Sequence, residues 1–173
     1  MKQNRQHAFT LYELLIALAV MSIGMTMALP ALSSLKQHSE REALRNHLHA
    51  SIDHARLQAV LNKTTVELCG SRDGLNCSRD WSRGWRIQLY HSPAHTLLVQ
   101  KNRTSQPLQW AGFDQRIRFY ANGTSPSSNG RFFQCRNSTV AWQLILNRQG
   151  RARIARADEN LAEGHRCESK TAP

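Results

Sequence analysis

Several chemical motifs are missing from this 173-residue chain, and their absence excludes most kinds of catalysis. The sequence has no phosphate-binding loop, no recognisable pairing of a nucleophile with a base, and no Cys-x-x-Cys spacing of the kind that holds zinc. We therefore expect no enzymatic activity, no cofactor and no metal site. The alternative is a zinc site that uses His91 and His95, which stand beside the turn-forming pair Ser92-Pro93.

Acidic residues are scarce as well. The chain has 12 Asp and Glu against 23 Lys and Arg, which gives a formal net charge of +11. No acid falls between Asp114 and Asp158, so we expect the arginines of that stretch to be uncompensated. A basic surface attracts polyanions such as nucleic acid, acidic lipid headgroups or surface polysaccharide. The arginines in question are Arg116, Arg118, Arg131, Arg136, Arg148, Arg151, Arg153 and Arg156.

A long segment near the N-terminus lacks charge of either sign. No residue from Leu14 to Leu35 is charged, and a helix of that length, at about 1.5 Å per residue, covers the roughly 30 Å hydrocarbon core of a bilayer. The leader in front of it, Met1–Ala8, carries Lys2 and no acid, which favours retention on the cytoplasmic face of a membrane. A cleavable secretory signal fits less well, because Pro30 disturbs the small-residue site after the apolar run. The segment is therefore predicted to be a membrane-spanning helix.

Glu13 lies at the edge of this apolar segment. A carboxylate there costs about 2.5–3.5 kcal/mol on insertion scales and usually marks a functional group with a specific partner. The obvious partner is the amino terminus that cleavage before Phe9 would create. Glu13 is thus predicted to be functional.

The run Ala8-Phe9-Thr10-Leu11-Tyr12-Glu13 resembles the class III signal of type IV pilins and type II secretion pseudopilins. The resemblance implies that a prepilin peptidase cuts between Ala8 and Phe9 and methylates the Phe9 amine. It also implies that Glu13 pairs with the amine of a neighbouring subunit during filament assembly. This chain has Ala8 where that family usually has Gly, a difference that could slow processing.

Helical periodicity continues beyond the apolar segment, so we expect one helix from about Phe9 to Leu61 with an amphipathic second half. Pro30 should bend or loosen it. After Asn62 the pattern changes to short β-type runs separated by turn residues. These runs are Thr65–Cys69, Trp85–Tyr90, Thr96–Gln100, Ile117–Tyr120, Phe132–Cys135, Ala141–Leu146 and Arg151–Ala155.

The expected organisation is α+β, with a long N-terminal helix packed on an antiparallel β-sheet head. Residues 1–8 form the leader, 9–35 the membrane-spanning or filament-core half of the helix, 36–62 its amphipathic half, and 63–173 the head with its C-terminal tail. The polar stretches 70–79 and 121–130 are expected to be exposed loops, because they are rich in turn residues.

Four cysteines follow the membrane helix, in a compartment that we expect to be oxidising, and this predicts two disulfides. Four cysteines allow three pairings, and the sequence alone does not select one. We favour Cys69 with Cys77, which would close a polar loop, and Cys135 with Cys167, which would tie the tail to the head.

Three arginines surround a predicted hairpin turn. The runs 141–146 and 151–155 are joined by Asn147-Arg148-Gln149-Gly150, which would gather Arg148, Arg151 and Arg153 at one end. Arg151 and Arg153 would share a strand face about 7 Å apart, similar to the spacing of phosphates along a DNA strand. Arg156 would fall on the opposite face and is a secondary candidate. Contact with about three to five phosphates predicts a log–log salt slope of roughly −3 to −5.

Three segments of the head, 117–123, 130–135 and Gly150-Arg151-Ala152-Arg153, resemble the H-type pseudopilin and FimT-like minor pilin family. The resemblance implies a pilin fold, an inner-membrane anchor with a periplasmic head, and later placement in a pilus with other pilins. Its Gly-Arg-x-Arg element implies membership of the DNA-binding group used in natural transformation, with Gly150, Arg151 and Arg153 as site residues.

Other interpretations remain open at this point. The protein could be a structural minor pilin or a type II secretion pseudopilin that primes filament assembly without binding DNA, or an adhesin for acidic polysaccharide. The arginines could form a solvated edge strand that prevents aggregation. The tryptophans Trp81, Trp85, Trp110 and Trp142 could stack on single-stranded bases or, as is more usual, could pack in the core.

Overall fold

The computed structural model describes residues 11–90, 92–102, 104 and 106–168, with no side-chain description at 27, 28 and 92–94. The chain divides into two compact units, Met1–Arg41 and Glu42–Pro173. The predicted leader, residues 1–8, and the cleavage site between Ala8 and Phe9 lie outside the described residues.

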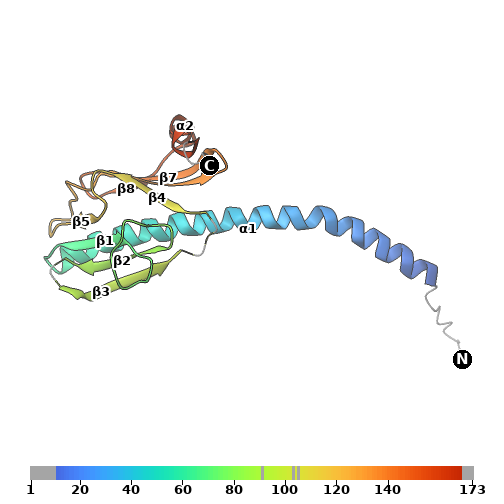
Figure 1. Cartoon of the computed structure of the whole chain (residues 1–173), viewed down its shortest axis with the longest axis horizontal. Coiled ribbons are helices and arrows are strands. Elements are labelled where there is room, and N and C mark those ends of the chain that lie inside the picture. The colour runs from blue at the N-terminus through green and yellow to red at the C-terminus, as the bar shows by residue number, and fades with distance from the viewer. Residues whose placement is uncertain (1–10, 91, 103, 105, 169–173) are drawn as a thin grey trace, which may run out of the picture. The chain divides into compact units, whose positions relative to one another are not determined.

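Helix α1 (Leu11–Leu61) is 51 residues long and continues through Pro30 (Figure 1). Its first part exposes an almost unbroken series of large apolar side chains, from Leu11 to Leu35. Among the described residues it is the one helix long and apolar enough to cross a membrane. The predicted long helix is confirmed, and the proline does not interrupt it.

The second half of α1 supplies one side of the core of the head. Leu44, Leu48, Ile52, Ala55 and Ala59 are buried at three- and four-residue intervals, which places them on a single helix face. Burying apolar surface at about 25 cal/mol per Å² is what stabilises this helix against the strands.

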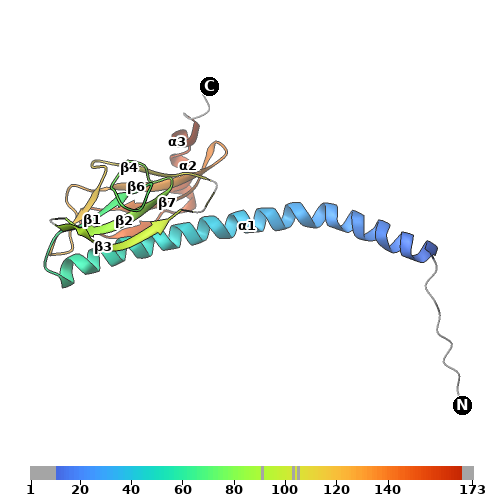
Figure 2. The ribbon, with the colours of Figure 1, turned by 60° about the horizontal axis from the view of Figure 1, so that its bottom comes forward.

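Two antiparallel four-stranded sheets pack on this helix face, with strand orders β3-β2-β1-β5 and β4-β6-β7-β8. Figures 1 and 2 show the first sheet and the second sheet meeting over the C-terminal half of α1. The strands are β1 (Val66–Gly70), β2 (Gly84–Leu89), β3 (Ser92–Lys101), β4 (Leu108–Gly112), β5 (Ile117–Phe119), β6 (Gly130–Arg136), β7 (Thr139–Leu146) and β8 (Ala152–Ile154).

Every predicted strand overlaps an observed one, but β4 was not predicted. Leu108 and Trp110 of β4 pack in or against the core, and the short run was hidden between Pro107 and Gly112. The expected α+β fold, a long helix on antiparallel sheet, is confirmed.

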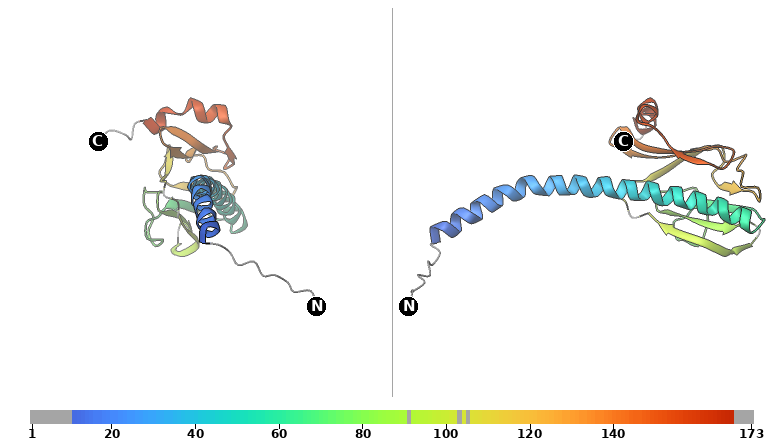
Figure 3. Two further views of the ribbon diagram at one scale, coloured as in Figure 1. Left: turned by 90° about the vertical axis from the view of Figure 1, so that its right-hand side faces the viewer. Right: turned by 180° about the vertical axis from the view of Figure 1, so that it is seen from behind.

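The tail forms two short helices, α2 (Ala157–Ala162) and α3 (His165–Glu168), which the sequence did not predict. They pack against β7, on the face of the sheet away from α1 (Figure 3). Gln143 of β7 is fully buried beneath them, and its Nε2 donates to the Glu159 carbonyl and to Asn160 Oδ1, both at 3.1 Å. β7 is therefore covered on both faces.

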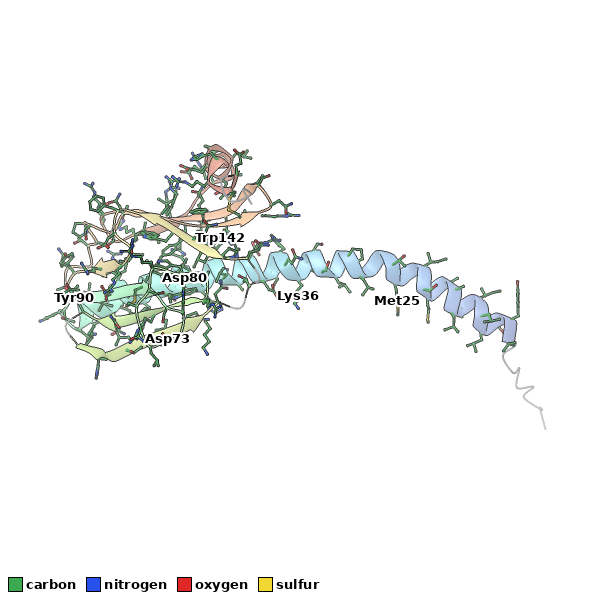
Figure 4. All side chains as sticks on the ribbon, viewed as in Figure 1. Met25, Lys36, Asp73, Asp80, Tyr90 and Trp142 are labelled. Atoms are coloured by element: carbon green, nitrogen blue, oxygen red, sulfur yellow. A yellow bond between two sulfur atoms is a disulfide. The ribbon has the colours of Figure 1, made fainter. Side chains whose placement is uncertain are left out.

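Disulfides join Cys69 to Cys77 and Cys135 to Cys167, which is the pairing that the sequence favoured. The first closes a loop over the outer face of the first sheet. Gln88 Nε2 donates to Cys77 Sγ there at 3.4 Å, and Figure 4 labels Asp73, which lies in this loop.

The stretches 70–79 and 121–130, predicted to be exposed loops, are largely exposed or half-buried, but a few of their residues enter the core. Ser71, Ser125 and Ser128 are buried. Serine is small enough to enter the edge of the core, and two of the three hydroxyls are hydrogen-bonded: Ser71 Oγ donates to the Asn76 carbonyl at 2.8 Å, and Ser128 Oγ accepts the Arg118 amide at 3.1 Å. These loops are built into the head.

Candidate nucleic-acid interface

The predicted β7–β8 hairpin is present, and hydrogen bonds fix its turn. Asn147 N donates to the Arg151 carbonyl at 3.1 Å, and Asn147 Oδ1 accepts the Arg151 amide at 3.0 Å. Gly150 N closes the turn on the Asn147 carbonyl at 3.0 Å, and Gly150 adopts φ +73°, a conformation that glycine adopts without steric cost. These hydrogen bonds fix the backbone that carries Arg148 and Arg151.

A second loop braces this turn. Ser125 N donates to the Arg148 carbonyl at 3.0 Å, and Arg56 of α1 donates through Nε to the Gly123 carbonyl at 3.0 Å. Gly150 is buried against the same Gly123, where a Cβ would stand 2.4 Å from the Gly123 carbonyl oxygen. Gly150 was predicted as a DNA-binding residue, but its buried position indicates that it shapes the turn.

Replacing Gly150 with alanine is expected to destabilise the head by about 1–3 kcal/mol, because alanine is strained at positive φ and its Cβ would collide with a backbone oxygen. Urea unfolding followed by tryptophan fluorescence measures this. Gln149→Ala, an exposed substitution one residue away, is the control and should change stability by less than about 0.5 kcal/mol. Equal stability of the two variants would contradict the bracing role.

Arg148 and Arg151 are exposed, and neither guanidinium has an acidic partner among the described residues. Arg148 lies within the turn and Arg151 follows it directly, since β8 begins only at Ala152. The end of α1 lies at the same end of the head, because Gly123, which packs on Gly150, also lies against Val60, and the exposed Lys63 follows three residues later. No pattern in the sequence singled out Lys63. These three cations form what we call the turn patch.

The other two predicted arginines of the hairpin are neutralised by the tail. Arg153 makes a two-pronged ion pair with Glu159, Nη1 to Oε2 at 2.8 Å and Nη2 to Oε1 at 2.6 Å. Arg156 pairs with Asp158 at 3.3 Å and caps α2 instead of continuing the strand. The prediction that these arginines lack compensation was therefore wrong.

The pair shifts the titration of Glu159. Hydrogen bonds from the Arg153 side chain, and then from the Arg156 amide, lower the pKa of Glu159 to about 2. The same hydrogen bond to Glu159 raises the pKa of Arg153. Glu159 thus stays ionised at any ordinary pH. Arg153 can therefore bind a phosphate only if the phosphate displaces the Glu159 carboxylate.

Acids from distant parts of the chain compensate other arginines of the same stretch. Arg116 and Arg118 share the buried Glu67 at 3.5 and 3.3 Å, and Arg131 pairs with Glu163 in the tail. Arg136, the last residue of β6, is exposed and without an acidic partner among the described residues. The basic bias of the sequence is therefore reduced, in this part of the head, to a few free guanidinium groups.

The tryptophans belong to the core and do not form a stacking surface. Trp81, Trp85 and Trp142 are buried, and Trp110 is half-buried with its ring 4.4 Å from that of Phe132. The alternative of base stacking on tryptophan is therefore not supported.

One group of ligand-type atoms gathers in the described part of the head, formed by Glu67, Cys69 and Cys77. Its two sulfur atoms are joined in a disulfide, so they are not thiolates that could hold a metal. His95 is exposed on β3, whereas His91 lies outside the described residues.

At the other end of the chain, Glu13 stands in the first turn of α1 and is exposed. A negative charge in the first turn of a helix stabilises the helix, because it interacts favourably with the positive end of the helix dipole. Its predicted partner, the Phe9 amine, lies outside the described residues.

Comparison with known proteins gives two family matches. Residues 3–29 match the prokaryotic N-terminal methylation motif, and residues 45–150 match type II transport protein GspH. The second match covers α1 from Arg45 through the hairpin turn and stops before Arg151. No curated protein matches the chain.

Among solved structures, the chain resembles the type IV minor pilin FimU of Pseudomonas aeruginosa PAO1 in two crystal forms. The TM-scores are 0.56 and 0.55, with 22% and 20% identity over 69% and 68% of this chain and 93% and 94% of the FimU chain. At this identity the likeness establishes the fold alone. The methylation motif, the pilin-like fold and the match over residues 45–150 agree, and this chain belongs to the family of type II transport protein GspH.

Proposed function

We propose that this protein is a minor type IV pilin that captures extracellular DNA through the turn patch and so supports DNA uptake in natural transformation. The observation that carries the proposal is the pair of exposed arginines, Arg148 and Arg151, held without an acidic partner among the described residues on a hydrogen-bonded turn. A guanidinium group binds phosphate with two parallel hydrogen bonds. Phosphate contacts alone carry no sequence information, so DNA of any sequence should bind.

Few basic side chains of the hairpin are free to contact DNA phosphates. Arg148, Arg151 and Lys63 are available directly, whereas Arg153 must first leave Glu159. About two to four neutralised phosphates correspond to a log–log salt slope of roughly −2 to −4, shallower than the sequence alone suggested. Affinity of a single copy should be modest, in the micromolar range or weaker.

The proposal includes a maturation path. A prepilin peptidase removes residues 1–8 and methylates Phe9, and residues 9–35 anchor the protein in the inner membrane with its head in the periplasm. Glu13 then pairs with the Phe9 amine of a neighbouring pilin as the filament forms. The methylation motif over residues 3–29 and the exposed apolar surface of α1 support this path.

A second candidate function is priming of pilus or pseudopilus assembly without DNA binding. The observation in its favour is a set of apolar side chains on the last turns of α1, where Leu57, Val60 and Leu61 are 53%, 45% and 65% exposed. Exposed apolar groups in one place mark surfaces that other proteins cover. A priming subunit would tolerate the loss of Arg148 and Arg151.

A salt titration of DNA binding separates the two candidates. The variant Arg148→Gln, Arg151→Gln should bind duplex DNA about ten- to thirty-fold more weakly, because two charged hydrogen-bonding groups are lost from an exposed site. Its salt slope should be less steep by about 2, since each contacted phosphate contributes about 0.9. The full-length chain in neutral detergent, titrated by fluorescence anisotropy at several salt concentrations, gives both quantities.

Arg136→Gln is the matched control. Arg136 is also exposed and without an acidic partner in the described chain, but it lies beyond the opposite end of β7, a strand of 8 residues, or about 26 Å away. If the control weakens binding as much as the double variant does, net charge alone governs binding and the turn patch is not a site. If none of the proteins binds DNA, the priming function replaces the proposal.

A further inference from the structure

A cavity of about 540 Å³ opens beside the first sheet and is lined by residues other than those of the turn patch. Its volume falls within the range of about 300–1,000 Å³ that is typical of small-ligand sites. One wall is the end of the disulfide loop and the other is the β4–β5 turn with the start of β5. The lining residues that carry charge or aromatic surface are Arg79, Phe113, Asp114, Arg116 and Arg118.

Both walls are held in place. In the β4–β5 turn, Trp110 Nε1 donates to the Asp114 carbonyl at 2.7 Å, and Asp114 Oδ1 accepts the Gln115 amide at 2.7 Å. Phe113 N donates to the Asn129 carbonyl at 3.2 Å. In the facing loop, Cys77 is bonded to Cys69. The cavity is thus framed by backbone that is fixed before any ligand arrives.

Phe113 is the unusual residue of this frame. Its side chain is 87% exposed although the turn that carries it is pinned on both sides. The fixed backbone limits where the ring can lie, and the exposed ring beside the cavity offers apolar contact area to a ligand. Phe113 therefore indicates a binding surface.

Beside this ring, positive charges outnumber negative ones: Arg79, Arg116 and Arg118 line the cavity with one acid, Asp114, whose side chain is 33% exposed. Arg79 is exposed and has no acidic partner among the described residues, and the Arg116 side chain is 45% exposed. Glu67, which Arg116 and Arg118 share, is only 2% exposed and is covered by their guanidinium groups. Asp114 directs Oδ2 toward Arg118 at 3.7 Å. A ligand meets an aromatic face flanked by two guanidinium groups.

We propose that this cavity binds a nucleotide of single-stranded DNA, with its base stacked on Phe113 and the neighbouring phosphates held by Arg79 and Arg116. This inference rests on the proposed function, because it assumes that the protein contacts DNA. A base in a duplex has both faces covered by its neighbours, so only a single strand can present a face to Phe113. Stacking on an aromatic ring does not depend on base identity, in keeping with binding that does not read sequence.

The test compares single-stranded and duplex DNA of the same length on the full-length chain in neutral detergent. Phe113→Ala should weaken single-strand binding by about five- to tenfold and leave duplex binding within about twofold. Arg79→Gln should also weaken single-strand binding more than duplex binding. Leu161→Ala, which removes another exposed apolar side chain from α2, is the control and should change neither.

Phe113→Trp provides a second, independent measurement. It keeps an aromatic face and adds an exposed indole, whereas Trp81, Trp85 and Trp142 are buried. Single-stranded DNA should quench the added emission and duplex should not. Equal affinity of wild type and Phe113→Ala for single strands, or absence of quenching, overturns the proposal.

The outcomes also separate this inference from the proposed function. If Arg148→Gln, Arg151→Gln weakens binding of both DNA forms and Phe113→Ala weakens neither, DNA capture stands and the cavity has no part in it. If wild type binds no DNA, both fail. If Phe113→Ala lowers recovery in filaments while DNA binding is unchanged, the ring is a contact for another pilin and the nucleotide site is rejected.

Discussion

Replacing Glu13 with alanine is expected to remove the protein from filaments while leaving the head folded. The carboxylate lies next to a segment without charge, where it costs about 2.5–3.5 kcal/mol on insertion scales unless a partner compensates it. The proposed partner is the amine of Phe9 in a neighbouring subunit. Loss of the charge removes the compensation between subunits, and the core of the head, which begins at Leu44, is not touched.

The measurement is an immunoblot of sheared filaments against whole membranes from the same cells. Glu13→Gln keeps the shape of the side chain without its charge and should fail like alanine if ion pairing is the reason. Glu40→Ala, which removes a carboxylate from the same helix outside the apolar segment, is the control and should assemble normally. Normal filament recovery of Glu13→Ala would remove the assembly role.

Removing the Cys135–Cys167 disulfide should cost the head about 3–4 kcal/mol of stability, according to the chain-entropy model for a bridge with a sequence separation of 32. The Cys69–Cys77 bridge spans 8 residues, so its removal should cost less, about 2–3 kcal/mol. Urea unfolding of Cys135→Ser, Cys167→Ser beside Cys69→Ser, Cys77→Ser measures the difference. A larger loss from the shorter bridge would show that packing, not loop closure, sets the effect.

The variant Cys135→Ser, Cys167→Ser should bind DNA more strongly than the wild type, although it is less stable. Release of the tail separates Glu159 from Arg153 and Glu163 from Arg131, which frees two guanidinium groups on the hairpin and on β6. Glu159→Gln isolates this effect, because it frees Arg153 with both disulfides intact. Unchanged binding in Glu159→Gln would mean that Arg153 does not reach DNA.

Lowering the pH should also weaken the contact between the tail and Arg153. The pKa of Glu159 is lowered from 4.5 to about 2 in the folded protein, first by the Arg153 side chain. The stabilisation from this pair is therefore complete above pH 4.5 and is lost as the pH falls from there toward 2. Docking of the tail, followed by hydrogen exchange of α2, should weaken over that interval and not at neutral pH.

The sequence predicted the elements whose signal is local. The three- and four-residue spacing from Leu44 to Ala59 identified the buried face of α1, and Asn147 with Gly150 identified the hairpin turn. β4 was missed because its run of five residues follows a proline and ends on a glycine. α2 was missed because its six residues have no apolar period, and it is held in place by Gln143 of β7.

The candidate site was predicted less well than the fold because charge compensation depends on tertiary contacts. Glu67 and Arg118 are 51 residues apart in sequence, yet they pair across adjacent strands. Arg153 and Glu159 are only 6 residues apart, but their meeting requires the chain to reverse into α2. Counting acids along the sequence therefore overestimated the free positive charge of the head.

The carboxylate of Glu159 has a further consequence for ligand choice, if DNA lies along the hairpin as proposed. A free phosphate or mononucleotide must displace Glu159 in order to gain a single contact with Arg153. A long strand already held at Arg148 and Arg151 presents its next phosphate to Arg153 at a high effective concentration, and so can compete with the attached acid. Competition by Glu159 in the tail would then weaken the binding of small anions to Arg153 more than the binding of long DNA strands.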